Sequence, residues 1–377
     1  MNFKPFAYLS LLLAASCAPA VMDDAVFGSF SYSGSDARYA APFNPETEFI
    51  NPVLSGFFPD PSICRRGEDY FMVNSTFVYS PGITVLHSRD LVHWEQIGSV
   101  LDGKWRASFE GLPLNAGVYA PSICYNHFNG QFYLLNTVVG GMENFFSRSS
   151  DPLSGNWSEP VRLPELDGID PSFFFDDDGR AYIVFSGKPE GGAQWHGHTA
   201  IRLYEFDYRN GRVVGKDKVL LEAGLHPEEK PVWIEAPHIY KVNGRYYLIA
   251  AEGGTDIWHS EVALVSDNVD GPYRPCPVNP ILTQRSLPEQ REDKVTSAGH
   301  ADLVWTPSGD CWAVFLACRP YDEDFYNTGR ETYLLPVDWS AGYPVILPEG
   351  ESIPTVCRRP ALADAPMADY PKSGNFE

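Results

Sequence analysis

One phrase returns five times along the chain, and this internal repeat constrains the fold more than any other feature. Each copy has a short β-rich run, a turn that contains glycine and a second β-rich run, and successive copies start 50 to 66 residues apart. The copies start at Asp60-Pro61, Ala120-Pro121, Asp170-Pro171, Ala236-Pro237 and Ala301-Asp302. Repeats of this length with about four strands each are typical of propeller blades and argue against a β-sandwich. The sequence therefore predicts an all-β fold, a five-bladed β-propeller whose equivalent strand ends ring one mouth of a central channel.

Acidic residues stand at matching positions of these copies. The aligned column holds Asp60, Asp170 and Asp302, and Glu235 stands one position earlier in the fourth copy. Asp60, Asp170 and Glu235 belong to different predicted blades, so we expect them to converge on one mouth. Convergent carboxyl groups suggest glycoside hydrolysis, in which one carboxylate activates water and another group holds a proton for the leaving oxygen. The apolar neighbours of Glu235 favour it as the acid, which makes Asp60 the base.

Several of these motifs also have a purely structural interpretation. Aspartate before proline is a common turn former. The run Asp176-Asp177-Asp178-Gly179 predicts a hairpin turn, with calcium binding as the weaker alternative. Asp302 lacks a following proline and could be a hydrogen-bond acceptor within its own blade. His196 and His198 have a spacing that could ligate a metal, but no third ligand is evident.

Charge and cysteine content narrow the class of partner. The formal net charge is −21, so the chain repels nucleic acid and anionic membranes, and a neutral partner is expected. Aromatic residues make up 14% of the chain, which suits both β-structure and sugar-stacking surfaces. No CxxC pair or metal-ligand spacing occurs among the cysteines. Cys64 and Cys124 hold the same place in two copies, which predicts buried strand positions.

The N-terminus has the pattern of an export signal over residues 1–20. Lys4 precedes the short apolar run from Leu9 to Ala15, and small residues follow. Cys17 ends a box typical of bacterial lipoproteins, whereas Ala18-Pro19-Ala20 offers an ordinary cleavage site. We expect an exported protein, either a lipoprotein of the periplasm, outer membrane or cell surface, or a secreted protein. Membrane attachment is expected only through that lipid.

The remaining boundaries follow from composition. Residues 21–48 are small and polar, which predicts a tether. The predicted catalytic propeller spans residues 49–340. Residues 341–377 are rich in proline and predict either a C-terminal wrap or a truncated linker.

A set of phrases along most of the mature chain carries a family resemblance. They are Asn51–Ser62, Asp90–Trp94, Asp170–Gly179, Glu235–His238, Glu252–Thr255, Gly299–Val304 and Gly329–Thr332. On these phrases the chain resembles glycoside hydrolase family 43, particularly its β-xylosidase and α-L-arabinofuranosidase members. The resemblance implies a five-bladed propeller and an inverting mechanism. It also implies that Asp60 is the general base, Glu235 the general acid, and Asp170 the residue that tunes and orients the acid.

The same resemblance implies further substrate-binding residues. By family pattern Arg330 binds sugar hydroxyls, Phe77 and Tyr119 shape the pocket, and Thr255 lies near its mouth. Tyr119 departs from the pattern, because the family usually has tryptophan before Ala-Pro. Trp195, in a glycine-rich insertion, could reach over the sugar or could be an ordinary loop aromatic.

His300 is the one residue for which the resemblance suggests a cation. It could hold a water or a hydrated cation in the central channel, such as a structural Ca²⁺, or it could be a hydrogen-bonded core histidine. No cofactor is expected to be required. Many β-xylosidases of this type continue into a C-terminal β-sandwich, whereas this sequence stops at Glu377.

The expected function is an exo-acting glycosidase that releases xylose or arabinose from plant cell-wall (arabino)xylan oligosaccharides, so the partner is a pentose-containing oligosaccharide or polysaccharide. Within the enzymes, an endo-arabinanase with the same triad and an open cleft is an alternative, and a retaining propeller hydrolase that acts on fructans is another. Outside the enzymes, the alternative is a catalytically silent sugar-binding propeller on the cell surface. The sequence does not indicate an oligomeric state.

Overall fold

The structure, a computed structural model, describes residues 29–31, 40, 42–101, 105, 109–321, 325–365 and 373–375. The chain divides into two units, Asp36–Met367 and a terminal unit of Met1–Ser35 with Ala368–Glu377. In the terminal unit, β1 (Ser29–Ser31) pairs antiparallel with β24 (Ser373–Asn375). The predicted signal peptide, with Cys17, lies outside the described residues. Among the residues described, no helix is long and apolar enough to cross a membrane.

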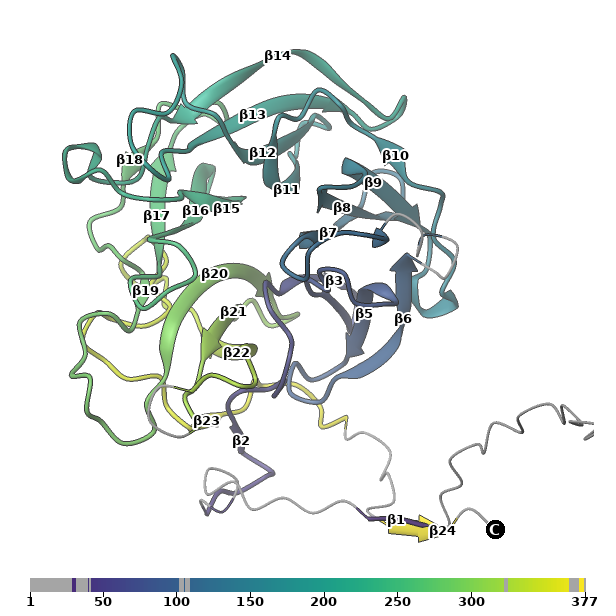
Figure 1. Cartoon of the computed structure of the whole chain (residues 1–377), viewed down its shortest axis with the longest axis vertical. Coiled ribbons are helices and arrows are strands. Elements are labelled where there is room, and N and C mark those ends of the chain that lie inside the picture. The colour runs from purple at the N-terminus through teal and green to yellow at the C-terminus, as the bar shows by residue number, and fades with distance from the viewer. Residues whose placement is uncertain are drawn as a thin grey trace, which may run out of the picture. The chain divides into compact units, whose positions relative to one another are not determined.

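The larger unit is a ring of five antiparallel sheets whose first strands lie nearest the centre (Figure 1). Blade one is β3 (Ser62–Arg66), β4 (Asp69–Val73), β5 (Gly82–Ser88) and β6 (Glu95–Leu101); blade two is β7 (Gly117–Asn126), β8 (Gln131–Val139), β9 (Glu143–Ser149) and β10 (Val161–Arg162); blade three is β11 (Gly168–Phe175), β12 (Ala181–Gly187), β13 (Ala200–Asp207) and β14 (Arg212–Leu221); blade four is β15 (Glu235–Val242), β16 (Arg245–Glu252), β17 (Ser260–Ser266), β18 (Arg274–Pro275) and β19 (Leu282–Thr283); blade five is β20 (Thr296–Trp305), β21 (Cys311–Cys318) and β22 (Arg330–Pro336). Two 3₁₀ turns, η3 (Pro152–Ser154) and η4 (Pro227–Glu229), lie between strands. The predicted five-bladed β-propeller is confirmed.

Aromatic side chains fill the wedge between neighbouring blades. The ring centroids of Phe71 and Phe132 lie 5.0 Å apart between blades one and two. Equivalent contacts join Tyr133 to Phe173 at 5.5 Å, Phe174 to Tyr246 at 6.0 Å, and Tyr240 to Trp305 at 5.5 Å. Large rings suit this place because blades diverge outward and each junction needs bulk to exclude water. The high aromatic content of the sequence is therefore used largely inside the fold.

At the channel mouth, left-handed residues stand at equivalent places in the five blades, inside the inner strand in blades two to five and two residues before β3 in blade one. Their φ angles are +52° at Asp60, +32° at Ala120, +52° at Asp170, +51° at Ala236 and +55° at His300. In four blades this residue lies within a register shift against the next strand, as between Gly299 and Asp302 in blade five. His300, and not Asp302, is therefore equivalent to Asp60. The predicted alignment of Asp302 is wrong by two residues, because the fifth copy has no proline to mark the position.

The ring is closed by the segment that precedes blade one. Leu54 pairs with Thr332 of β22, and Asn51 exchanges hydrogen bonds with Leu334 of the same strand at 2.9 and 3.0 Å. The N-terminal segment thus pairs with the outer edge of blade five, which has only three strands of its own. Next to this closure, β2 (Glu48–Ile50) pairs with β23 (Val356–Arg358).

Two smaller predictions are also answered. The Asp176–Gly179 run forms the hairpin turn between β11 and β12, as predicted. The Asp176 carboxylate is buried and accepts from Lys241 Nζ at 2.6 Å and Tyr246 Oη at 2.7 Å, which does not fit a calcium ligand. The six described cysteines are not disulfide-bonded, and Cys64 is buried as predicted whereas Cys124 is only half-buried.

Candidate active site

A cavity of about 510 Å³ opens at the channel mouth where the inner strands begin. All five blades contribute to it. Its lining is Asp60, Phe77, Asn115, Tyr119, Ala120, Ile169, Asp170, Trp233, Glu235, Gly254, Thr255, His300 and Arg330. The structure therefore brings together eight of the nine residues proposed from the sequence, and the exception is Trp195.

Asp60 is a buried carboxylate surrounded by donors. Its Oδ1 accepts from Arg330 Nη1 at 2.6 Å, and its Oδ2 accepts a short hydrogen bond from Ser75 Oγ. His300 Nδ1 lies 3.7 Å from Oδ1. Burial alone would raise the pKa of Asp60, but Arg330, His300 and Ser75 together outweigh it and hold the pKa below its usual value. Asp60 is therefore ionised at neutral pH, as a base requires.

Asp170 and Glu235 have the opposite electrostatic environment. Burial, followed by the negative charge of Asp60, raises the pKa of Asp170 to about 7. Burial and then the charges of Asp170 and Asp60 raise the pKa of Glu235 well above its usual value. Among the described residues, none donates a hydrogen bond to the Glu235 carboxyl. The pair thus retains a proton at a pH where Asp60 has none.

A backbone contact holds this pair in place. The Oδ2 of Asp170 accepts from the backbone N–H of Ala236 at 3.2 Å. Ala236 directly follows Glu235 in β15, so Asp170 fixes the strand entry that carries the glutamate. The contact agrees with the orienting role that was expected of Asp170.

Aromatic rings and a guanidinium form the wall beside Asp60. The Arg330 guanidinium lies 5.3 Å from the centroid of the Phe77 ring, and Phe77 meets Tyr119 edge-on at 5.2 Å. Tyr119 Oη donates to the carbonyl oxygen of Asn115. Tyr119 therefore closes this wall with its hydroxyl tied back to its own blade. Thr255, after β16 in blade four, also lines the cavity.

Two buried imidazoles lie close to this site, His300 in the cavity lining and His259 outside it. Burial lowers the pKa of His300 to about 3 and that of His259 to about 4. Both rings are therefore neutral over the usual pH range. His259 Nδ1 lies 2.9 Å from the carbonyl oxygen of Ser297, and its buried Nε2 has no hydrogen-bond partner among the described residues.

Trp195 supports the cavity from outside. Its indole N–H donates to the carbonyl of Pro231 at 2.7 Å, and its ring stacks on His198 at 3.7 Å. His198 contacts the backbone of Gln194 and Glu222, whereas His196 faces Trp233, so the two histidines do not form the metal pair considered from the sequence. The tryptophan that lines the cavity is Trp233, which the sequence analysis missed. Its position two residues before Glu235 was the available signal.

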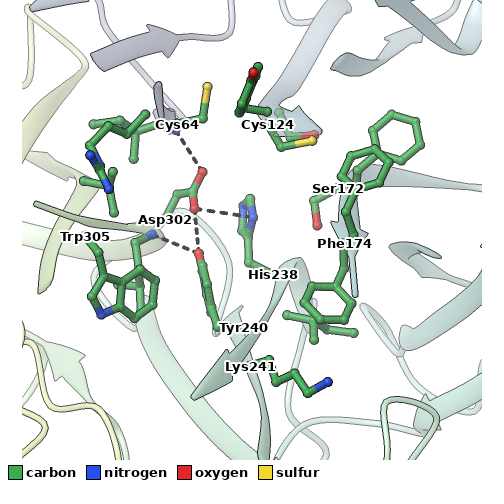
Figure 2. A pocket seen from close by; sticks show the side chains of 18 of the residues that line it. Cys64, Cys124, Ser172, Phe174, His238, Tyr240, Lys241, Asp302 and Trp305 are labelled. Atoms are coloured by element: carbon green, nitrogen blue, oxygen red, sulfur yellow. Dashed lines mark hydrogen bonds and ion pairs between the residues drawn. The ribbon is translucent and has the colours of Figure 1, made fainter. Parts of the chain in front are cut away.

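A second and larger cavity, of about 640 Å³, lies at the far end of the inner strands (Figure 2). Its one buried carboxylate, Asp302, accepts from Ser62 Oγ at 2.6 Å, from the N–H of Ile63 at 2.9 Å and from Tyr240 Oη at 2.5 Å. Asp302 thus joins blades one, four and five. The sequence suggested an acceptor within its own blade, but the donors come from the two neighbouring blades. Because this carboxylate is fully hydrogen-bonded, the far cavity has no free buried carboxylate, unlike the cavity lined by Asp60, Asp170 and Glu235, here called the carboxylate cavity.

The structure is thus a five-bladed propeller with three carboxyl groups convergent on one cavity. The sequence profile of the glycosyl hydrolases family 43 matches residues 49–344, and the chain belongs to this family. It is 41% identical over 300 residues to a xylosidase/arabinosidase of Butyrivibrio fibrisolvens, covering 79% of this chain and 56% of that protein. It is 37% identical over 309 residues to a non-reducing-end α-L-arabinofuranosidase of Bacteroides ovatus, covering 80% of this chain and 54% of that protein.

Solved structures give the same result. A GH43_12 protein from a capybara gut metagenome superposes with a TM-score of 0.81 at 45% identity, over 89% of this chain and 61% of that one. A xylan β-1,4-xylosidase from Bacillus halodurans gives a TM-score of 0.77 at 34% identity, over 86% of this chain and 61% of that one. The chain thus spans a little over half the length of the relatives it matches.

Proposed function

We propose that the chain is an inverting glycosidase that releases xylose or arabinose from the ends of plant cell-wall oligosaccharides. One observation carries the proposal. A single cavity holds an Asp60 carboxylate kept ionised by Arg330 and a Glu235 carboxyl kept protonated by burial and by Asp170. That division of charge is what hydrolysis with an acid and a base needs. The names of the matching relatives, xylosidase/arabinosidase and α-L-arabinofuranosidase, support a pentose as the sugar released.

The reaction takes place in one displacement. Asp60 removes a proton from water while the water oxygen attacks the anomeric carbon from the face opposite the leaving group. The bond between that carbon and the glycosidic oxygen breaks, and the proton of Glu235 passes to this oxygen. The products are a free sugar of inverted configuration and an alcohol, and the two carboxyl groups end with their protonation exchanged. Arg330 holds Asp60 in place and offers further N–H donors to sugar hydroxyls.

Two kinds of substrate, natural oligosaccharides and aryl glycosides with a good leaving group, together test the role of Glu235. We expect Glu235→Ala to lower kcat/KM by about 10²–10⁴-fold on natural oligosaccharides, and much less on 4-nitrophenyl xyloside or arabinofuranoside, because a good leaving group needs little protonation. The control is Glu229→Ala, an exposed glutamate of the turn η4 that precedes this blade, which should behave as wild type. Equal losses on both substrate types would contradict the assignment. Sugar binding by a wild-type chain that cleaves none of these substrates would favour the sugar-binding alternative.

We also propose that His300 holds a hydrated cation in the channel, Ca²⁺ being the expected ion. Its neutral ring and the unpartnered Nε2 of His259 fit a ligand role. Within the described residues, the one group of three potential ligand atoms lying within 4.8 Å of one another is elsewhere, at Asp90, His93 and Asp364, so a cation near His300 would bind mostly through water. A fall in the thermal unfolding temperature on chelation, restored by Ca²⁺, is the expected result. No step of the reaction depends on the ion.

Export remains a proposal that rests on the sequence of residues 1–20. Cell fractionation, with mass spectrometry of the mature N-terminus, distinguishes lipidation at Cys17 from plain cleavage.

A further inference from the structure

Trp233 lies at the rim of the carboxylate cavity, beside the residue proposed as the acid. It lines the cavity, stands two residues before Glu235 and keeps 40% of its surface exposed. Asp60 and Asp170 keep only 4% and 7% of theirs. The cavity thus has an enclosed end at Asp60 and an open end with an indole ring.

Two loops on the same side of the propeller fix the position of this indole. The backbone of Trp233 is left-handed, with φ +50°, and its backbone N–H donates to the carbonyl of Gly197 at 2.6 Å. A Cβ on Gly254 would lie 2.5 Å from the Trp233 ring, and a Cβ on Gly197 would lie 2.8 Å from Val232. Only glycine allows both loops to pack this closely. Backbone strain at a rigidly supported residue is typical of functional positions, because exposed surface alone does not require it.

The insertion that contains Trp195 belongs to the same support. Trp195 donates to the carbonyl of Pro231, two residues before Trp233, and Gly253 donates to the carbonyl of Val232 at 3.0 Å. His196 meets the Trp233 ring edge-on at 5.2 Å. A tryptophan held from three directions and still exposed on the cavity side is a preformed platform.

The chemistry of the cavity decides which sugar this platform meets. The acid protonates the leaving-group oxygen, so the leaving group lies on the side of Glu235. The reacting ring lies at the enclosed end, against the directly bonded Asp60 and Arg330 side chains. We infer that Trp233 binds the leaving-group sugar by stacking the indole against the C–H face of that ring. This inference rests on the proposed function and adds to it a binding site for the leaving group.

Substrates that differ only in the leaving group test the inference. With Trp233→Ala we expect kcat/KM to fall about tenfold or more on xylobiose or arabinobiose, mainly through KM. On the methyl glycoside of the same sugar, whose leaving group is too small to stack, it should stay within about threefold. Trp233→Phe should recover part of the loss. Inhibition by free xylose or arabinose, which occupies the enclosed end, should not change.

The matched control is Trp258→Ala. Trp258 is 61% exposed, follows the same Gly253-Gly254 loop and does not line the cavity, so its loss should affect neither substrate. Gly254→Ala should reproduce the effect of Trp233→Ala without removing the ring, because the new Cβ displaces it. Thermal unfolding of each variant identifies any that fails to fold.

The outcomes separate this inference from the proposed function. If wild type is active and Trp233→Ala lowers kcat/KM equally on both substrates, or on neither, the platform is refuted and the hydrolase stands. If wild type cleaves no glycoside, the proposed hydrolase fails, and calorimetric titration of wild type and Trp233→Ala with xylobiose and arabinobiose decides the inference. A loss of affinity of about tenfold supports it, whereas unchanged affinity, or no binding by wild type, overturns it.

Discussion

Asp60 and Glu235 carry opposite charge states in one cavity because their neighbours differ. Asp60 contacts a guanidinium and a hydroxyl, both of which stabilise its anion. Glu235 has neither, and it faces two other carboxyl groups. Protonation is therefore retained by Asp170 and Glu235 and not by Asp60, because Asp60 is the acid that has Arg330 as a hydrogen-bond partner.

The dependence of activity on pH follows from these pKa directions. Asp60 must be ionised, and its lowered pKa places the acidic limb of kcat/KM below about pH 4. Glu235 must be protonated, so activity is lost as the pH rises through its raised pKa.

Asp170→Asn tests the electrostatic part of this account. It removes the negative charge that raises the pKa of Glu235, so we expect the alkaline limb of the kcat/KM profile to move to lower pH, while the carboxamide oxygen can still accept from Ala236. Asp167→Asn, at an exposed aspartate paired with Lys188, is the control and should leave both limbs in place. An alkaline limb that stays fixed in Asp170→Asn, or moves to higher pH, would show that Asp170 does not tune the acid.

At the scale of single residues, the sequence predicts the position of a side chain where that position recurs in the repeat. Asp60, Asp170 and Glu235 could be placed in one cavity because they stand at matching positions of equivalent strands. The matching position of the first copy holds Phe57, which does not line the cavity, so the repeat alone does not place Trp233 there. The exposure of Trp233 depends on loops at Gly197 and Gly254 that are distant in sequence. The one local feature that separates it from Trp195, which does not line the cavity, is its position two residues before Glu235.

Among the elements, the inner strands are specialised at their entries. The left-handed residue and the register shift turn one side chain of each strand toward the mouth. Such an interruption of a strand is a usual way to direct a side chain at a functional site. Asp60, Asp170 and His300 occupy this position in three blades, and alanine occupies it in the other two.

The fifth copy shows why the alignment from sequence was displaced. Proline follows the left-handed residue in four copies, but Ala301 follows His300. Asp302 then looked equivalent to Asp60, although it stands in register with Ser62, Ser122, Ser172 and His238. The structure resolves this because backbone geometry, unlike residue type, is shared by all five strands.

Asp302→Asn tests the role of Asp302 as a link between blades. The amide nitrogen of asparagine cannot accept the hydrogen bonds that a carboxylate oxygen accepts from Ser62, Ile63 or Tyr240. We expect the free energy of unfolding to fall by about 2–3 kcal/mol, measured by thermal or urea unfolding. At a temperature where the variant is folded, kcat/KM should change less than about threefold. Asp310→Asn, an exposed position on the same blade, is the control, and equal stability of the two variants would refute the link.

At the scale of the whole molecule, the segment that closes the propeller also leads into the site. The segment that pairs with β22 runs directly into Asp60, and the N–H of Phe58 donates to the carbonyl of Arg330 at 3.0 Å. Thr332 Oγ1 donates to the carbonyl of Phe58 at 2.8 Å. The base and its arginine, 270 residues apart in the chain, are therefore brought together by the contact that closes the propeller.

Asn51→Ala tests this closure. Asn51 is fully buried and makes two hydrogen bonds with the backbone of Leu334, so its removal leaves an N–H and a carbonyl of β22 without these partners. We expect a loss of about 2–4 kcal/mol of stability, with activity lost at the same lower temperature as the fold. Asn156→Ala, at an exposed asparagine in blade two, should match wild type. An unfolding temperature for Asn51→Ala equal to that of wild type would show that these bonds do not hold the ring.

The configuration of the first sugar released tests the central claim most directly, because only a base that activates water opposite an acid gives inversion. Proton NMR of the wild-type reaction, recorded before mutarotation, follows the anomeric signals. We expect α-xylose from a β-xyloside or β-arabinose from an α-L-arabinofuranoside, with no comparable signal from Asp60→Asn. A retained anomer, or hydrolysis by Asp60→Asn at the wild-type rate, would contradict the assignment of Asp60 as the base and Glu235 as the acid.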